Sequence, residues 1–381
     1  MRLPTLLALA ALNISCGSAG DPGQQPLRGV FSGASSRTSA LLSLHKSLVE
    51  IPSISDSENE VSHFLKGYLE KQGLNVETQV VQGGKNIFAY AGTSRKTRIL
   101  VTSHIDTVPP FWPYERKGDE IWGRGSVDAK GSVAAQVIAF QELLDAEKLR
   151  DGDVSLLFVV GEENSGRGMK AANNLGLSWE AVIFGEPTEL KLASGHKGGI
   201  GFKLVAKGKA GHSGYPEQGE NAIDLLVKGL ASLQKLELPW SERFGNSTLN
   251  VGRIEGGVAA NVIPADASAT ALIRIAAGSP EKVLDLVRDA VYNAAPELEV
   301  ESRAPGKGPV PIDYDIQGFE TAVMNYGTDI PNLEGNHKRY LYGPGTILVA
   351  HSDHEHLTTQ DLETAVDGYK VLITENLKKG R

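Results

Sequence analysis

Residues 98–106, RILVTSHID, join a short apolar run to two polar residues that can bind metal, His104 and Asp106. Two further apolar runs, VSLLFVV and AVIFG, also end just before acidic residues. The acidic residues that follow them are Glu162, Glu163 and Glu186. Short runs that are apolar almost throughout are typical of strands buried on both faces of an α/β sheet. Ligands bind beyond the carboxyl ends of such strands, so these side chains are expected to converge at one edge.

The elements around these strands predict two domains. A helical stretch, GSVAAQVIAFQELLDAEKL, separates the first two strands, as in an α/β sheet with helices on its faces. After residue 197 the pattern changes to strands with alternating exposure and to two amphipathic helices, which indicates a compact α+β unit of about 100 residues. We therefore expect a catalytic domain in two parts, residues 38–197 and 306–381, interrupted by an inserted domain at residues 198–305. Capping boxes are predicted at Ser57–Glu60 and Thr358–Asp361.

The amino terminus has the features of a secretory signal peptide. Residues 1–19 carry one positive charge, then an apolar stretch too short to span a membrane stably, then small residues. A lipoprotein anchor at Cys16 is the alternative, which the residues before Cys16 fit poorly. Residues 20–37 are rich in Gly, Ser, Gln and Pro and are expected to form a flexible leader. The chain is therefore predicted to be secreted.

The composition limits the partners of the chain and the residue types that can bind metal or act as nucleophiles. The 381-residue chain has a formal net charge of −8, which argues against a nucleic-acid surface. Cys16 is the only cysteine, so a mature chain without the signal has no thiolate to bind metal or to act as nucleophile. Histidine and carboxylate side chains remain as ligands, and their gathering at strand ends predicts a metallohydrolase. Asn246 begins an Asn-Ser-Thr triplet that fits N-glycosylation.

Five motifs, SHIDTVP, GRGSVDAKG, GEENSGRG, FGEPTE and AHSDHEH, occur in this order. Together they resemble the M20 family of zinc peptidases and deacylases, from about residue 40 to the end. The resemblance implies a mixed-sheet, zinc-exopeptidase-like catalytic domain of the α/β class, with an inserted α+β dimerisation (lid) domain and a homodimer formed through it.

The resemblance also implies roles for the residues in these motifs. Two zinc ions are expected, with cobalt or manganese as the alternatives. The implied ligands are His104 and Glu186 for one ion, Glu163 and His351 for the other, and Asp128 as the bridge between them. Glu162 would be the general base, and Asp106 would orient His104. His351 is favoured over His354 and His356, and Glu355 is either a supporting residue or a helix-start charge.

The inserted domain carries a second set of residues implied by the resemblance. His212, in AGHSGYPEQGENAI, would stabilise the tetrahedral oxyanion, commonly in the active site of the partner subunit. Asn261 and Arg274 would contact the carboxylate of the substrate. Gly345, in the segment Gly343-Pro344-Gly345, would line the pocket. His196, Lys197 and His337 receive no role and are expected to be structural or rim residues.

The function that these expectations favour is a secreted dinuclear-zinc hydrolase that cleaves an amide bond next to a free carboxylate. A carboxypeptidase-type exopeptidase is favoured, because an exported enzyme meets peptides, and the chain resembles secreted fungal members described as probable carboxypeptidases. An N-acyl-amino-acid deacylase is the alternative, which Glu186 favours because several peptidases of the family carry Asp there. Two further hypotheses are less favoured: an inactive metal-binding module and a two-metal phosphoesterase. A small peptide or an N-acyl amino acid is the expected partner, without nucleic acid or membrane.

Overall fold

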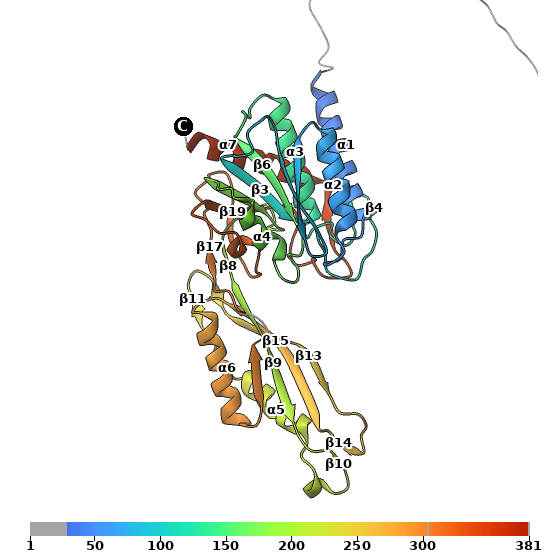
Figure 1. Ribbon diagram of the computed structural model, residues 1–381, viewed down its shortest axis with the longest axis vertical. Coiled ribbons are helices and arrows are strands. Elements are labelled where there is room, and N and C mark those ends of the chain that lie inside the picture. The colour runs from blue at the N-terminus through green and yellow to red at the C-terminus, as the bar shows by residue number, and fades with distance from the viewer. Residues whose placement is uncertain (1–28, 303–304, 380–381) are drawn as a thin grey trace, which may run out of the picture.

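The structure is a computed structural model that describes residues 29–302 and 305–379. It has a broad lobe and a narrow elongated lobe, which is inserted between two parts of the broad one (Figure 1). The expected signal peptide and the first part of the expected leader lie outside the described residues. Across the described ranges, no helix combines the length and apolar character needed to cross a membrane.

The broad lobe is built on a six-stranded mixed sheet. Its strand order is β1 (Asn75–Val81), β2 (Gly84–Tyr90), β6 (Val154–Val159), β3 (Ile99–His104), β7 (Ala181–Gly185) and β19 (Lys338–Tyr342). Strands β6, β3, β7 and β19 run parallel, while β1 and β2 are antiparallel to their neighbours. The predicted apolar runs form β3, β6 and β7, so the polar residues after them meet at one edge of the sheet.

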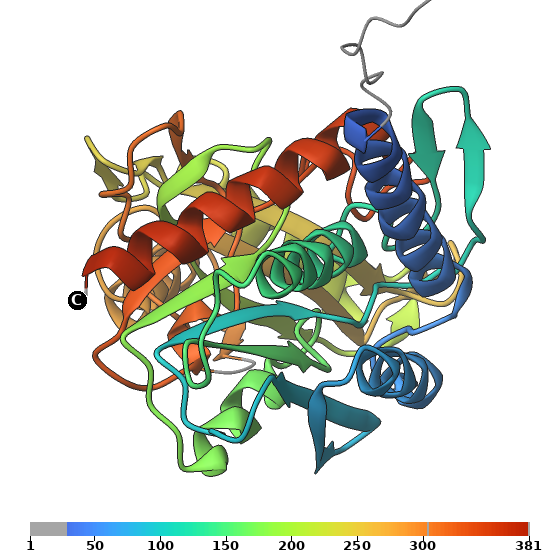
Figure 2. The same ribbon diagram turned by 90° about the horizontal axis from the view of Figure 1, so that it is seen from above.

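Alternate residues of the central strands enter two different cores. Val101 of β3 and Phe158 of β6 point into the core beneath α1 (Gly29–Glu50), α2 (Asn59–Lys71), α3 (Lys130–Asp145) and α7 (Thr359–Lys379). Seen from above, α1, α3 and α7 lie across this face (Figure 2). Leu100 and Leu157 point into the opposite core, beside α4 (Arg167–Ala172). Burial on both faces explains why these strands are apolar throughout.

Two of the local expectations need correction. Helix α1 begins at Gly29, inside the range expected for the leader, because the sequence continues into a buried stripe of Leu41, Leu44 and Leu48 that favours extending the helix. Helix α2 begins at Asn59 without a side-chain cap, so the Ser57–Glu60 box is wrong. The Thr358–Asp361 box is confirmed: each backbone N–H donates to the other side chain, at 3.3 and 3.0 Å.

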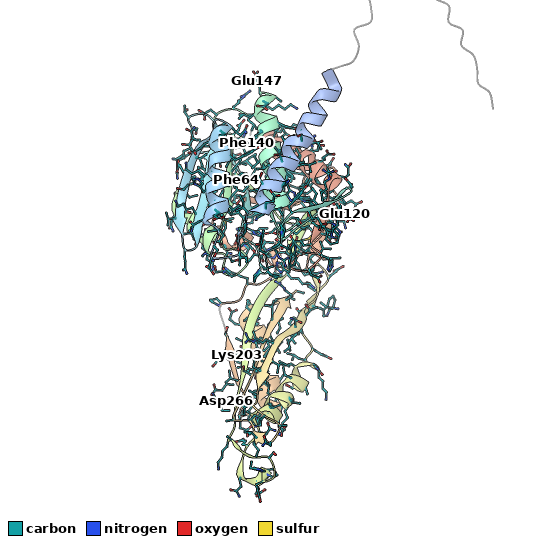
Figure 3. All side chains as sticks on the ribbon, turned by 90° about the vertical axis from the view of Figure 1, so that its right-hand side faces the viewer. Phe64, Glu120, Phe140, Glu147, Lys203 and Asp266 are labelled. Atoms are coloured by element: carbon teal, nitrogen blue, oxygen red, sulfur yellow. The ribbon has the colours of Figure 1, made fainter. Side chains whose placement is uncertain are left out.

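The narrow lobe is a four-stranded antiparallel sheet with two helices on one face. Its order is β13 (Thr248–Gly256), β15 (Asp266–Ile275), β9 (Gly198–Lys207) and β16 (Glu299–Ser302). Helices α5 (Ala222–Leu233) and α6 (Pro280–Ala294) cover the side chains of Phe202, Leu204 and Ile273. The other face is open, and Lys203 and Asp266 mark this lobe in Figure 3, below Phe64 and Phe140 of the broad lobe. This is the mixed α/β fold with an inserted α+β unit that the sequence predicts.

Short elements complete the two lobes. A three-stranded sheet, β17 (Val310–Pro311), β8 (Leu192–His196) and β18 (Thr321–Met324), lies where the lobes join. A second one, β20 (His356–Thr358), β5 (Glu120–Trp122) and β4 (Glu115–Lys117), flanks the broad lobe. The narrow lobe also has the strand pairs β10 (Gly211–His212) with β14 (Val262–Ile263) and β11 (Trp240–Ser241) with β12 (Gly245–Asn246). The 3₁₀ turns are Asn173–Leu175, Pro216–Gln218 and Ile330–Asn332.

Candidate metal centre

Asp128 lies between two histidines that come from distant parts of the chain. Its Oδ1 is 3.0 Å from Nε2 of His104, at the end of β3, and its Oδ2 is 3.2 Å from Nε2 of His351. Glu163 Oε2 lies 3.0 Å from the same nitrogen of His351, and Glu186 Oε2 lies 3.7 Å from Nε2 of His104. The structure thus brings all five expected ligands together, with one carboxylate facing both imidazoles.

The cluster fits metal ions chemically. Ligand atoms of His104, Asp128 and Glu163 all lie within 4.8 Å of one another. Buried carboxylates that face each other repel unless a cation lies among them. The set offers oxygen and imidazole nitrogen, which zinc, cobalt and manganese accept.

The protonation equilibria of these residues reflect the same crowding of charge. Burial raises the pKa of Glu186 to about 7 and, together with the charge of Asp128, raises the pKa of Glu163. Hydrogen bonds with Asp128 and Glu163 raise the pKa of His351 to about 10. Burial and then the charge of Asp329 hold the pKa of Glu162 well above its usual range.

Asp106 supports both the first histidine and the acidic loop. Its backbone oxygen lies 3.0 Å from Nδ1 of His104, and its carboxylate oxygen lies 3.5 Å from the same atom. The backbone N–H groups of Glu162 and Glu163 donate to its two carboxylate oxygens at 3.0 and 3.2 Å, and Ser55 Oγ donates at 2.7 Å. One buried residue therefore positions an imidazole through its backbone oxygen and the two glutamates through its carboxylate.

Glu355, whose role the sequence left open, supports the loop that carries Asp128. Its Oε1 accepts hydrogen bonds from the backbone N–H groups of Val127 and Asp128 at 3.1 and 3.2 Å. Its Oε2 pairs with Arg124 Nη1 at 2.6 Å, and both side chains are 1% exposed. Glu355 is therefore a supporting residue and not a helix-start charge.

The other two histidines of the AHSDHEH motif point elsewhere. His354 Nδ1 lies 2.8 Å from the carboxylate of its neighbour Asp353, and both side chains are exposed. The ring of His356 stacks on Trp122, with the ring centroids 4.5 Å apart. His351 adopts a left-handed backbone conformation with φ of 61°, which directs its ring toward Asp128 and Glu163.

A cavity of about 450 Å³ opens beside the cluster, between the two lobes. One side of it holds Asp128, Glu162, Glu163, Glu186 and His351. Arg274 of β15 and Lys197 line the opposite side. The guanidinium of Arg274 forms no ion pair or hydrogen bond with the described residues, so it is available to a ligand. Lys197 Nζ donates to the backbone oxygen of Asn246 at 2.6 Å.

Two residues expected at the site lie far from it in the same chain. His212 is exposed in β10, at the end of the narrow lobe that is remote from the broad lobe (Figure 1). Asn261 lies beside it, since its backbone oxygen accepts a hydrogen bond from Ser213 N at 3.1 Å. A Cβ at Gly345 would meet Val127 and Leu357 at 3.1 and 3.3 Å, and the role of Gly345 in the pocket stays a prediction. Asn246 is exposed in β12.

Sequence reasoning missed two residues near the cluster. Asp329 is buried, which raises its pKa to about 6, and its charge acts on Glu162. The short apolar run of residues 322–324 ends several residues before Asp329, so Asp329 does not directly follow a strand as the other acidic residues do. His196, expected to be structural or at the rim, lines the cavity, and burial lowers its pKa to about 4. His196 is therefore neutral near pH 7.

Comparison with known proteins adds independent information. Residues 194–299 match the family model described as a peptidase dimerisation domain. A peptidase M20 domain-containing protein of Schizosaccharomyces pombe is 49% identical over 344 residues, which cover 89% of this chain and 85% of that protein. A probable carboxypeptidase of Aspergillus flavus is 46% identical over 399 residues, covering 93% and 95%.

Solved structures share the fold. An M20 family metallo-carboxypeptidase from Sulfolobus solfataricus superposes with a TM-score of 0.71 at 19% identity, covering 88% of this chain and 99% of the other. A dinuclear metal-binding M20 peptidase from Bacillus subtilis gives a TM-score of 0.64 at 16% identity, covering 90% and 99%. Because both identities are below 20%, these superpositions show that the fold is shared across both lobes and nothing beyond the fold.

Proposed function

The chain belongs to the M20 family of metallopeptidases, and on that premise we propose that it is a secreted dinuclear-zinc carboxypeptidase. The observation that carries the proposal is the pairing of an acid–histidine cluster with an unpartnered arginine across one cavity. The acid–histidine cluster suits hydrolysis of an amide, and the arginine suits the binding of a free carboxylate next to that amide. The curated relatives described as probable carboxypeptidases support the same assignment.

In this proposal His104 and Glu186 would hold one ion, Glu163 and His351 would hold the other, and Asp128 would be shared between them. The supporting geometry is the position of Asp128, whose two oxygens each face a different imidazole. When bound, a pair of zinc ions would polarise the scissile carbonyl and lower the pKa of the attacking water. The described Bacillus relative binds two metal ions, which favours two over one.

Glu162 is the proposed general base. It precedes the expected ligand Glu163 in a loop whose backbone Asp106 fixes through two hydrogen bonds, and Glu162 itself lines the cavity. Its raised pKa suits a group that takes a proton from water and then delivers it to the leaving nitrogen. The amide C–N bond breaks, the carbonyl carbon gains the oxygen of water, and the amine leaves protonated.

Arg274 is proposed to bind the free α-carboxylate of the substrate. Its guanidinium lies in the cavity without a partner among the described residues, and a carboxylate can accept two parallel hydrogen bonds from it. A peptide that ends with an amide would lose this pair and leave the arginine unpaired. The preference for a free carboxyl terminus is therefore expected to be strong.

His212 and Asn261 are proposed to act in the active site of a second subunit. Both lie at the far end of the narrow lobe, so neither reaches the cavity of its own chain. The match to a dimerisation domain supports a homodimer that could bring this end to the neighbouring cavity. Mixing His212→Ala with Glu162→Gln tests this, because each mixed dimer would keep one complete site. Activity that stays absent after subunit exchange would refute the shared site.

Export and glycosylation complete the proposal. Secretion rests on the sequence of residues 1–19, which lie outside the described residues. Glycosylation at Asn246 is supported by its exposure, although the neighbouring Ser247 Oγ donates to Pro239 O at 2.5 Å. Recovery of the chain from culture medium, with a mass that falls after enzymatic removal of N-glycans, is the expected result.

The second candidate is an N-acyl-amino-acid deacylase, which Glu186 favours. The test is mass-spectrometric product analysis with the zinc-loaded protein. The substrates are short peptides with free or amidated carboxyl termini, N-acetyl amino acids and N-succinyl amino acids. Loss of single residues only from free carboxyl termini is expected. Release of acyl groups with peptides left intact would establish the deacylase instead.

A further inference from the structure

The loop of residues 161–166 carries the proposed general base, Glu162, and is closed by backbone hydrogen bonds. The N–H groups of Ser165 and Gly166 donate to Gly161 O at 3.3 and 2.8 Å. Gly161 has φ of 70°, a left-handed conformation that glycine adopts without steric cost. A group that fixes Gly161 therefore fixes the closure of the loop, one residue from Glu162.

The guanidinium of Arg167 packs directly against Gly161. A Cβ placed on Gly161 would lie 2.3 Å from Arg167 Cζ and 2.4 Å from its Nη1, so a methyl group there would displace the arginine. Arg167 Nη1 also donates to Asn164 Oδ1 at 2.8 Å. Arg167 therefore contacts the residues immediately before and after the two glutamates, whose own backbone N–H groups donate to Asp106.

Contacts with two further segments hold the guanidinium in this place. Nη2 donates to Glu58 Oε1 at 2.7 Å, Nη1 lies 3.1 Å from Asp56 Oδ1, and Nε donates to Gln82 O at 2.7 Å. These partners lie just before α2 and in the turn between β1 and β2. The planar fork of donors on one arginine thus ties the loop to two other parts of the broad lobe.

The pair of Arg167 with Glu58 also balances charge next to Asp106. Glu58 is fully buried, and its Oε2 forms no hydrogen bond with the described residues. Burial and then the charge of Asp106 raise the pKa of Glu58, because the two carboxylates repel each other. Ser55 Oγ, three residues before Glu58, donates to Asp106 at 2.7 Å, so one short segment links both supports of the loop. Without the guanidinium, the repulsion would act on that segment uncompensated.

We infer that Arg167 is a positioning residue for the proposed reaction, which holds Glu162 where its carboxylate can take a proton from the attacking water. The inference rests on the proposed function, in which Glu162 is the general base. Arg167 does not line the cavity, so it acts through the loop and not through the substrate. A displacement of about 1 Å at a catalytic group can lower turnover by roughly a hundredfold.

The first measurement is hydrogen exchange of the backbone amides of residues 161–166 in the metal-free protein, which needs no turnover. Arg167→Ala should speed this exchange by roughly tenfold, as for the loss of one charge-assisted hydrogen bond. Arg98→Ala is the matched control. Arg98 donates to both carboxylate oxygens of Glu180 at 2.9 and 2.8 Å, at the end of β3 remote from His104, and its loss should leave the exchange unchanged. Unchanged exchange in Arg167→Ala would overturn the inference.

The second measurement is steady-state turnover of peptides with free carboxyl termini by the metal-loaded full chain. Arg167→Ala should lower kcat by roughly ten- to hundredfold and leave KM nearly unchanged, because Arg274 still binds the substrate. Added guanidinium ions should restore part of kcat in this variant, whereas sodium chloride at the same concentration should not. Arg167→Lys keeps the charge without the planar fork, so its kcat should lie between those of the parent and of Arg167→Ala.

The outcomes separate positioning from a purely structural role. A structural role would lower the midpoint of urea unfolding and the fraction of active protein, with a normal kcat per active site and no rescue by guanidinium. A near-normal kcat in Arg167→Ala would therefore refute the positioning of Glu162. Absence of turnover by the parent protein on every peptide would refute the proposed function instead, and the exchange measurement would still decide whether Arg167 holds the loop.

Discussion

Replacing Glu355 by Gln should destabilise the loop of Asp128 far more than the small chemical change suggests. The pair with Arg124 is buried, with both side chains 1% exposed. The substitution removes the carboxylate that neutralises the buried guanidinium, which keeps only a hydrogen bond to Pro110 O and the ring of Trp112 as described partners. Breaking such a pair costs roughly 3–5 kcal/mol. Gln can still accept the two backbone hydrogen bonds of Val127 and Asp128, so we expect the lower end, about 3 kcal/mol.

The measurement is urea unfolding of the metal-free protein, which avoids stabilisation by bound ions. Asp353→Asn is the matched control, since this carboxylate lies two residues away and its side chain is 93% exposed. Adding Arg124→Met to Glu355→Gln should recover part of the lost stability, because neither member of the pair is then charged. A loss below about 1 kcal/mol for Glu355→Gln, similar to the control, would refute a buried charge pair as the support of this loop.

The remaining predictions concern turnover, acid stability and a helix cap. Glu162→Gln should retain bound metal but lower kcat by about 10²–10⁴, checked by metal analysis and steady-state rates, and a near-normal rate would contradict the general-base role. Burial lowers the pKa of His45 to about 4, so the folded state keeps it neutral while the unfolded chain binds a proton below about 6.5. Neutral His45 therefore makes its full contribution to the free energy of unfolding above pH 6.5. As the pH falls from 6.5 toward 4, roughly 3 kcal/mol of that free energy is lost. His45→Gln should flatten this part of the pH–stability curve. Thr358→Ala removes the hydroxyl that accepts from Asp361 N and should cost about 1 kcal/mol in urea unfolding, with an unchanged midpoint arguing against the cap.

The sequence is most informative where local pattern and burial agree. The runs before His104, Glu162 and Glu186 are apolar because β3, β6 and β7 are buried on both faces, so one signal predicts both the strands and the edge where their polar residues meet. The smaller lobe is likewise predictable, because α5 and α6 each bury one stripe of side chains.

The sequence is least informative where a role depends on partners far along the chain. Glu355 pairs with Arg124 across 231 positions, and Arg167 pairs with Glu58 across 109. Neither arrangement leaves a periodic pattern in the sequence. The positions of His212 and Asn261 depend on how far the narrow lobe extends, which follows from strand length and lobe orientation together.

Asp106 couples the positions of several groups at the metal centre, which limits how this position can be substituted. Its backbone oxygen contacts the imidazole of His104, and its carboxylate holds the backbone of the loop that carries both glutamates. A substitution of Asp106 would release the backbone N–H groups of Glu162 and Glu163 in one step, and no single further mutation at either glutamate could restore both contacts. The placement of the proposed general base and of one expected ligand therefore depends on this one side chain.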